Sequence, residues 1–352
     1  MVEGELLRFV NKRYMGDVIY SNAYPLTRLG GLMPSRETIP LSLIHPKDAE
    51  LDYALLEIGV LVPSTNIQWR VKVNGISVTK EFKPHIVSKA GENLFAKLVY
   101  DITSILRTPE GLRKKRVNVT FKHEGGEQII VEHLAVLAFY KTEEAVTDIT
   151  FLSGAVSLKP GEGIAVNIPY SGVHGVLRST LFIPSSNAQA FIEINGSKRI
   201  DIGGIQGPYE IIETIDNLKE NNTILFRHEE AETIYYPKEM RLSNILILRT
   251  EYKMPKLGIK DIDIRDAEKR GKIIHVKLVN NGVSKPDSAL IVLMSLGNAV
   301  ARKIIKPIEP GQEVEEEIPV NLPRGEYDLV LRIIWRKLSK TWFNDKRVKL
   351  VF

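Results

Sequence analysis

LEIGVLVPSTNIQWRVKVNG (residues 56–75) and LRSTLFIPSSNAQAFIEING (residues 177–196) are two versions of one stretch of sequence. They align without a gap, and seven of their twenty positions are identical, including the closing Asn-Gly pair. A second match follows, where FKHEGGEQI (121–129) corresponds to FRHEEAETI (226–234). The chain therefore contains two copies of one domain-sized unit.

Short strand-like segments alternate with turn signals through both copies. The segments at 71–73 and 191–194 are rich in β-branched and aromatic residues, and an Asn-Gly turn follows each of them. No stretch keeps a helical spacing of apolar residues for more than about two turns. The sequence predicts an all-β chain in which each copy of the repeat forms a jelly-roll β-sandwich.

Copy one is longer than copy two. The offset between matching positions falls from 121 at the first motif to 105 at the second, and the additional residues lie around 82–92 and 108–115. Inserted surface loops often carry binding residues. The segment before Pro34 also has no counterpart in copy two, so we expect it to contact another subunit or another part of this chain.

The last part of the chain is a different unit that follows a linker at Pro255. Apolar residues alternate at Ile262 and Ile264 and again at Ile274 and Val276, which predicts strands with one buried face. We therefore predict three domains. Their boundaries are 1–147, 148–254 and 255–352.

The third domain contains three turn motifs in a characteristic order. They are Val279-Asn-Asn-Gly282, Glu309-Pro-Gly-Gln312 and Gly325-Glu-Tyr-Asp328, and we expect each glycine to adopt a positive φ. In these motifs the domain resembles the CARDB family of immunoglobulin-like adhesion domains, over about 95 residues. The resemblance implies an immunoglobulin-like sandwich. The acidic ending common in that family is replaced by a basic segment at 337–347, so no cation site is carried over.

The two repeated domains resemble the galactose-binding-like jelly-roll domains of family 2 glycoside hydrolases. The resemblance rests on Val71-Lys-Val-Asn-Gly75, Tyr100-Asp-Ile-Thr103 and Val117-Asn-Val119, and copy two lacks the Asp-Ile-Thr motif. It implies a sandwich of the sugar-binding kind without an active site of its own.

Composition excludes several classes of site. The 352 residues include no cysteine, which rules out disulfides, thiolate metal sites and a cysteine nucleophile. The net charge of +5 is uneven: +2 over 1–147, −3 over 148–254 and +6 over 255–352. Few glutamines and many charged residues indicate a thermophile, an archaeon or its virus.

Localisation signals are absent from the sequence. No apolar run reaches the length of about 18–20 residues that a membrane-spanning helix needs, and no signal peptide is visible at the N-terminus. We expect a location at a cell surface or in a virion, with the cytoplasm as the alternative.

No catalytic signature is present: the sequence has no G-x-S-x-G, P-loop, H-E-x-x-H or dinucleotide-binding motif. His123-Glu124 and His228-Glu229 occupy equivalent places in the repeat. Such pairs can bind a metal, but a duplicated strand end also explains them, and we adopt that interpretation. We predict a protein without catalytic residues, metal or cofactor.

Two basic segments are the candidate binding residues. One is the cluster Arg113, Lys114, Lys115 and Arg116 on the second inserted loop. The other mixes aromatic and basic side chains. Its members are Trp335, Arg336, Lys337 and Trp342. Such surfaces bind phosphates or stack on sugar rings and bases. The alternative is that Trp335 and Phe343 belong to the core.

These observations favour a non-enzymatic structural or adhesive protein, a self-associating subunit of a surface, filament or virion assembly. The alternative is a carbohydrate-binding protein that binds a polysaccharide through loops of the first sandwich. A lesser alternative is an accessory subunit of a hydrolase. Nucleic acid is not an expected partner.

Overall fold

The computed structural model describes residues 3–46, 49–229, 239–267 and 271–352. These residues form 26 β-strands and two short helices, which confirms the predicted all-β class. In the described part of the chain, neither helix is long and apolar enough to cross a membrane.

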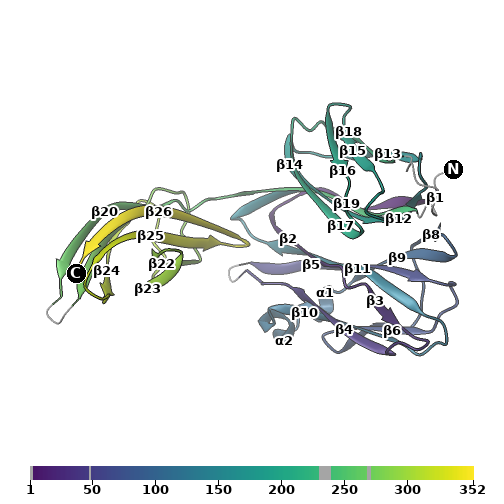
Figure 1. The fold of residues 1–352 in the computed structure, drawn as a ribbon, viewed down its shortest axis with the longest axis horizontal. Helices are drawn as coiled ribbons and strands as arrows, with labels where there is room; N and C mark the ends of the chain where they lie inside the picture. The colour runs from purple at the N-terminus through teal and green to yellow at the C-terminus, as the bar shows by residue number, and fades with distance from the viewer. Residues whose placement is uncertain (1–2, 47–48, 230–238, 268–270) are drawn as a thin grey trace. The chain divides into compact units, whose positions relative to one another are not determined.

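The chain divides into two compact units. The first comprises Met1–His45 and Glu50–Glu251, and the second comprises Pro46–Ala49 and Tyr252–Phe352. The first unit contains both copies of the repeat, and each copy forms a β-sandwich (Figure 1).

The first sandwich stacks two antiparallel sheets. Inner sheet 1 has the order β2 (Gly16–Ala23), β11 (Ile129–Lys141), β5 (Glu50–Val62), β9 (Asn93–Asp101) and β8 (Ile86–Ala90), and β3 (Thr27–Leu29) also pairs with β11. Outer sheet 1 has the order β4 (Arg36–Ser42), β10 (Arg116–His123), β6 (Trp69–Val73) and β7 (Ile76–Thr79). Alternating side chains such as Leu56, Val71 and Phe121 are buried and form its core.

The second sandwich repeats this arrangement. Inner sheet 2 has the order β1 (Glu3–Tyr14), β12 (Ala145–Leu158), β19 (Met240–Tyr252), β14 (His174–Ile183) and β17 (Gly207–Asp216). Outer sheet 2 has the order β13 (Gly163–Pro169), β18 (Asn221–His228), β15 (Ala190–Ile194) and β16 (Lys198–Ile202). Leu177, Ile192 and Phe226 are fully buried in its core.

Eight strands of each copy correspond in order. Strands β2, β4, β5, β6, β7, β9, β10 and β11 match β12 to β19, with the same neighbours in both sandwiches. Copy one adds β1, β3, β8, α1 (Thr103–Leu106) and α2 (Pro109–Arg113). The insertions expected around 82–92 and 108–115 are therefore β8 with its turn, and α2.

The repeated Asn-Gly pairs form the same tight hairpin turn in both sandwiches. Asn74 and Gly75 have φ of 50° and 89°, and Asn195 and Gly196 have φ of 52° and 66°. Two successive positive φ values define the turn that matches the twist of a two-residue hairpin. Each Asn side-chain oxygen also accepts a backbone hydrogen bond from the neighbouring strand, at 3.1 Å and 2.9 Å.

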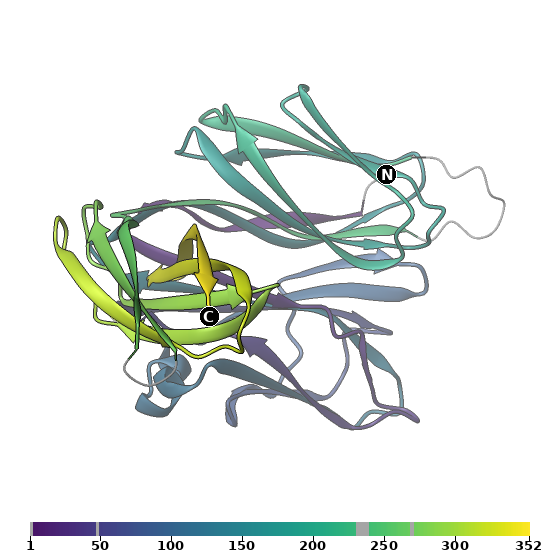
Figure 2. The same ribbon diagram turned by 60° about the vertical axis from the view of Figure 1, so that its left-hand side comes forward.

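The two inner sheets pack against each other, as Figure 2 shows from a second side. Leu137 and Phe139 of β11 contact the same apolar cluster as Phe151 of β12 and Leu246 of β19. The inner strands are therefore buried on both faces, which explains their continuous apolar runs.

The N-terminal strand β1 belongs to the sheet of the other copy. It pairs antiparallel with β12 from Glu3↔Ser157 to Tyr14↔Thr147. The expectation for the segment before Pro34 therefore holds for β1, whose target is within the same chain, while β2 and β3 pair with β11 of their own sandwich. The domain boundary placed at residues 147–148 falls inside β12.

The second unit is a sandwich of three and four strands. One sheet has the order β20 (Leu257–Asp266), β21 (Lys272–Asn280) and β24 (Glu313–Val320), and the other has the order β23 (Asn298–Ile305), β22 (Ser288–Ser295), β25 (Glu326–Lys337) and β26 (Lys340–Val351). Seven antiparallel strands in two sheets are typical of the predicted immunoglobulin-like class.

The Asn280-Asn-Gly282 turn of this unit does not have the positive φ that was predicted for its glycine. Gly311 has a positive φ of 75°, whereas Gly282 does not have a positive φ. Gly282 is required by close approach, because a Cβ there would lie 2.3 Å from the carbonyl oxygen of Met254. Asn280 fixes the turn: its amide nitrogen donates to the carbonyl oxygens of Ser284 and Ile308, both at 2.8 Å.

Candidate functional site

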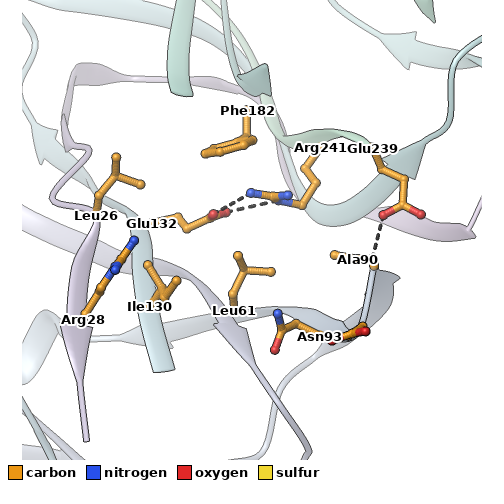
Figure 3. A pocket seen from close by; sticks show the side chains of 12 residues that line it. Leu26, Arg28, Leu61, Ala90, Asn93, Ile130, Glu132, Phe182, Glu239 and Arg241 are labelled. Atoms are coloured by element: carbon orange, nitrogen blue, oxygen red, sulfur yellow. Dashed lines mark hydrogen bonds and ion pairs between the residues drawn. The ribbon is translucent and has the colours of Figure 1, made fainter. Parts of the chain in front are cut away.

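A pocket of about 700 Å³ lies between the two sandwiches of the first unit (Figure 3). Its volume falls within the range of about 300–1,000 Å³ that small-molecule sites occupy. The first sandwich contributes β3, β5, β11 and the turn between β8 and β9. The second sandwich contributes the end of β14 and the start of β19.

A β-bulge in β11 places two polar side chains in the layer between the inner sheets. The pairing of β11 with β5 shifts between Val131 and His133, so Glu132 is the additional residue. Successive side chains of a regular strand point to opposite faces, and a bulge breaks this alternation. Glu132 and His133 are both buried as a result.

The carboxylate of Glu132 forms an ion pair that joins the sandwiches across the pocket. Arg241 of β19 donates from Nη2 and Nε to the two carboxylate oxygens, at 2.5 Å and 3.2 Å. The guanidinium also lies 3.9 Å from the ring centre of Phe182. Burial raises the pKa of Glu132, and the charge of Arg241 opposes this shift. This pair forms one fixed, neutral wall of the pocket.

The rest of the wall is apolar, with polar groups at the rim. Leu26, Leu61 and Ile130 face the pocket together with Phe182 (Figure 3). At the rim, Glu239 accepts a hydrogen bond of 2.7 Å from the backbone nitrogen of Gly91, in the turn between β8 and β9. This bond fixes the inserted turn against the second sandwich.

Three further polar side chains at the pocket are available to a ligand. Arg28, Glu92 and Asn93 are exposed, and within the described residues their side chains make no hydrogen bond or ion pair. Figure 3 shows the guanidinium of Arg28 on the pocket side of β3. An apolar wall beside unoccupied donors and acceptors is the usual composition of a binding site for a small polar molecule.

A second polar group lies deeper between the inner sheets. Glu57 accepts hydrogen bonds from Nζ of Lys97, Oγ of Ser153 and Nδ2 of Asn244, at 2.8, 2.5 and 2.7 Å. Burial lowers the pKa of Lys97 and lowers that of His133 well below its ordinary value. Glu57, Lys97 and His133 are at most 2% exposed, so this group connects the sandwiches and does not contact a ligand.

The first predicted binding cluster runs from the end of α2 to the first residue of β10. Arg113, Lys115 and Arg116 are exposed, and Lys114 forms an ion pair with Glu110 at 2.5 Å. The helix and its turn hold these cations apart from the pocket, and none of the four lines it.

The second predicted cluster lies on β25 and β26 of the second unit. Trp335 is 6% exposed and its Nε1 donates to the carbonyl oxygen of Pro255 at 3.0 Å. Lys337 is buried beside Asp287, at 3.4 Å. Arg336 donates to the carbonyl oxygen of Leu338, and Trp342 packs partly buried against the core. Trp335 is thus a core residue, as in the alternative that the sequence left open.

Phe343 does not follow that alternative. That alternative placed it in the core together with Trp335, but Phe343 is 60% exposed. The guanidinium carbon of Arg332 lies over its ring, 4.3 Å from the ring centre. Strand alternation explains the difference, because Trp342 takes the inward position in the pair opposite Trp335.

The repeated histidines bond to the backbone of their own sandwich. In His123, Nδ1 lies 2.7 Å from the carbonyl oxygen of Gln68 and Nε2 lies 2.9 Å from that of Glu127. In His228, Nδ1 lies 3.0 Å from the carbonyl oxygen of Leu158. Across the described ranges, no group of three His, Asp or Glu side chains is arranged to hold a metal ion.

The pocket residues were missed at the sequence level, although two signals pointed to them. One was the insertion around 82–92, which carries the turn at Gly91. The other was a charged residue within an apolar run: Glu57 in LEIGVLV and Glu132 in IIVEHLAVL. A charge in a buried strand needs a partner. The partner Arg241 lies 109 positions from Glu132, in the other copy, and no local pattern identifies it.

No protein-family model and no curated protein matches the chain, so the CARDB resemblance has no support from a family match. Several solved structures resemble part of it. A putative β-galactosidase from Bacteroides fragilis is 15% identical over 60% of this chain and 33% of its own, with a TM-score of 0.22. A β-glucuronidase from Ruminococcus gnavus is 11% identical over 58% and 35%, with a TM-score of 0.19.

A third structure is a glycosyl hydrolase family 2 member from Bacteroides cellulosilyticus, 12% identical over 56% of this chain and 28% of its own, with a TM-score of 0.24. The chain spans about a third of the length of these proteins. Similarity at this level carries no functional inference.

Proposed function

We propose that this chain is a non-enzymatic carbohydrate-binding protein and that the pocket between its sandwiches holds the sugar. The observation that carries the proposal is the combination of an apolar wall with exposed side chains that have unoccupied hydrogen-bonding groups. A sugar presents C–H surfaces and hydroxyl groups at once, so it needs both kinds of contact.

The apolar contact comes from Phe182, Leu26 and Ile130, and the polar contact comes from Arg28 and Asn93. Hydroxyl groups both donate and accept, and Asn93 offers an amide that does the same. Arg28 adds five N–H donors in a fixed plane. Asn93 begins β9 directly after the turn from β8, and this turn exists only in copy one, which agrees with the predicted use of first-sandwich loops.

The ion pair of the buried carboxylate Glu132 supports binding without a chemical reaction. Hydrolysis of a glycosidic bond ordinarily uses a pair of carboxyl groups, one as acid and one as base or nucleophile. Glu132 is held by Nε and Nη2 of Arg241, so it is committed to the wall of the pocket. We therefore assign no catalytic residue.

The proposal does not extend to a structural, adhesive or virion role. The N-terminal segment was the part of the sequence that suggested pairing with another subunit. It forms β1, β2 and β3, and all three strands pair within the same chain: β1 with β12, and β2 and β3 with β11.

A glycan array followed by titration calorimetry tests the proposal. The full chain should bind one class of glycan. Asn93→Ala and Arg28→Ala should each weaken that binding about tenfold, the effect of losing roughly 1.4 kcal/mol of interaction. Asn187→Ala and Arg227→Ala change the same residue types at exposed positions outside the pocket and should leave the affinity unchanged.

Two results would contradict this function. One is the absence of binding to any glycan at high protein concentration. The other is binding that is lost equally in the pocket variants and in the two control variants.

A further inference from the structure

The solvent face of outer sheet 1 carries a row of cations. Arg36 of β4 and Arg70 of β6 lie on either side of Lys122 of β10, directly opposite it in the sheet. Lys72 follows two residues after Arg70 and therefore points to the same face. Neighbouring strands lie about 4.7–4.9 Å apart, so these positive charges are close together. We call Arg36, Arg70, Lys72 and Lys122 the basic face.

Little negative charge balances the basic face. Lys122 forms an ion pair with Glu124 at 2.6 Å, and this holds the pKa of Glu124 below its usual value, with a smaller contribution from Arg70. Within the described part of the chain, Arg36, Arg70 and Lys72 have no ion pair. Like charges opposite each other on neighbouring strands destabilise a sheet. An anion bound to this face would relieve that repulsion.

The second sandwich provides an internal comparison. At the positions of Arg36, Arg70 and Lys72, the register of outer sheet 2 places Gly163, Phe191 and Glu193. Only Lys122 keeps a cation, as Arg227. Outer sheet 2 has the same strand order without the basic face. The fold therefore does not require these cations, and their presence in copy one has another cause.

We propose that the basic face binds an anionic polysaccharide. The cations are arranged across the strands, from Arg36 through Lys122 to Arg70, and along β6, from Arg70 to Lys72. This arrangement suits an extended chain with repeated carboxylate or sulfate groups. Arginine pairs with such groups through two parallel hydrogen bonds. A hollow of about 190 Å³ gives space for one of them, and its charged lining is Arg70, Lys80, Lys122 and Glu124, so three cations face one carboxylate there.

A nucleic acid fits this face less well. Proteins that bind single strands supply exposed aromatic rings on which the bases stack. The aromatic residue at the hollow is Trp69, which is 4% exposed and donates its Nε1–H to the carbonyl oxygen of Glu81. The preference for a polysaccharide also rests on the proposed carbohydrate function, while the binding surface is separate from the pocket.

The test compares the full chain with two variants of equal net charge. Arg70→Ser with Lys72→Glu removes the two cations that β6 contributes to the basic face and introduces the acid that copy two holds at the second position. Arg227→Ser with Lys219→Glu makes the same charge change at exposed positions of copy two. The probes are heparin, polygalacturonate, neutral dextran and single-stranded DNA, each measured at low and at higher salt.

Heparin or polygalacturonate should bind the full chain, dextran should not bind to this face, and added salt should weaken the binding because counterions are released. The basic-face variant should lose at least about tenfold in affinity and show a smaller salt dependence. The copy-two variant should stay within about twofold of the full chain. The melting temperature of each variant reports whether it remains folded.

Three results would overturn the inference: equal loss of affinity in both variants, which indicates net charge alone; preference for DNA over both polysaccharides; or no binding of any polyanion. Asn93→Ala separates the two proposals, because it should weaken binding in the pocket and leave polyanion binding intact. Failure of one proposal is therefore visible without failure of the other.

Discussion

Glu57 is a charged side chain in the middle of the layer that joins the two sandwiches. Its three hydrogen-bond donors come from β9, β12 and β19, at separations of 40, 96 and 187 residues along the chain. Moving a carboxylate out of water is costly, and this cost is offset only where the remaining lone pairs are also satisfied. Asn244 and Ser153 of the other sandwich satisfy these remaining lone pairs of the Glu57 carboxylate.

Removing the cation from this group should be strongly destabilising. Lys97→Met leaves the Glu57 carboxylate buried without its counter-charge, and we expect the free energy of unfolding to fall by about 3–5 kcal/mol. Urea denaturation followed by circular dichroism measures this change. Lys89→Met, an exposed lysine on the adjacent strand β8, is the matched control and should change stability by less than about 0.5 kcal/mol.

A double variant separates charge from packing. Glu57→Gln with Lys97→Met removes both charges and keeps one acceptor oxygen for Asn244, while the hydroxyl of Ser153 can accept from the amide nitrogen, so the double variant should recover part of the loss. If Lys97→Met costs no more than the control, the ion pair does not hold the sandwiches together.

At the scale of single elements, the sequence specified the repeated strands well. The Asn-Gly turns, the additional segments of copy one and the absence of long helices are local properties, and local patterns predict them. The β-bulge at Glu132 could not be predicted, since it depends on how β11 pairs with β5 across the sheet. The partner Arg241 could not be predicted either, because the two copies must first pack together.

Strand β1 belongs to the N-terminal segment that was expected to contact another subunit or another part of this chain. Val10 and Tyr14 pack in the apolar cluster between the inner sheets, and the strand pairs with β12. Removal would expose the edge of β12 and part of that cluster, which favours aggregation.

Two residues of β1 test this role. Val10 is 7% exposed and Leu7 is 37% exposed. Val10→Ala should lower the free energy of unfolding by about 1–3 kcal/mol, because it removes buried methyl groups and leaves space behind. Leu7→Ala should cost less than about 0.5 kcal/mol, since its side chain is already partly in water. Equal effects at the two positions, or an unchanged melting temperature after deletion of residues 2–14, would show that β1 is dispensable.

At the scale of the whole molecule, the first unit brings together residues that neither sandwich could arrange alone. The pocket needs the β8–β9 turn of copy one and Phe182 and Arg241 of copy two. Duplication therefore supplied the fold, and the differences between the copies supplied the candidate binding surfaces. Both the pocket turn and the basic face occur in copy one and are absent from copy two.

The second unit has the features of an independently folding domain. Its core includes Leu257, Ile291 and Trp335. Its linker is part of the fold: the backbone nitrogen of Lys256 donates to Oδ1 of Asn280 at 3.1 Å, and the carbonyl oxygen of Pro255 accepts from Trp335. We expect a fragment of residues 252–352 to fold alone.

Calorimetry of two fragments tests this expectation. The fragment 252–352 should unfold in one cooperative transition, as small domains usually do. A fragment that begins at residue 258 lacks the acceptor for Trp335, the donor to Asn280 and the side chain of Leu257, which is 1% exposed. Burying one leucine contributes about 1.5–3 kcal/mol. The lost bond of Trp335 leaves its buried Nε1–H unpaired at a further cost of about 1–3 kcal/mol, whereas Oδ1 of Asn280 keeps the hydrogen bond from the backbone nitrogen of Gly282. Together these losses are a large part of the stability of a domain of this size, roughly 5–15 kcal/mol. The shorter fragment should therefore melt at a much lower temperature or not fold.

A broad, non-cooperative transition in the longer fragment, or equal stability of the two fragments, would show that the domain does not begin at the linker.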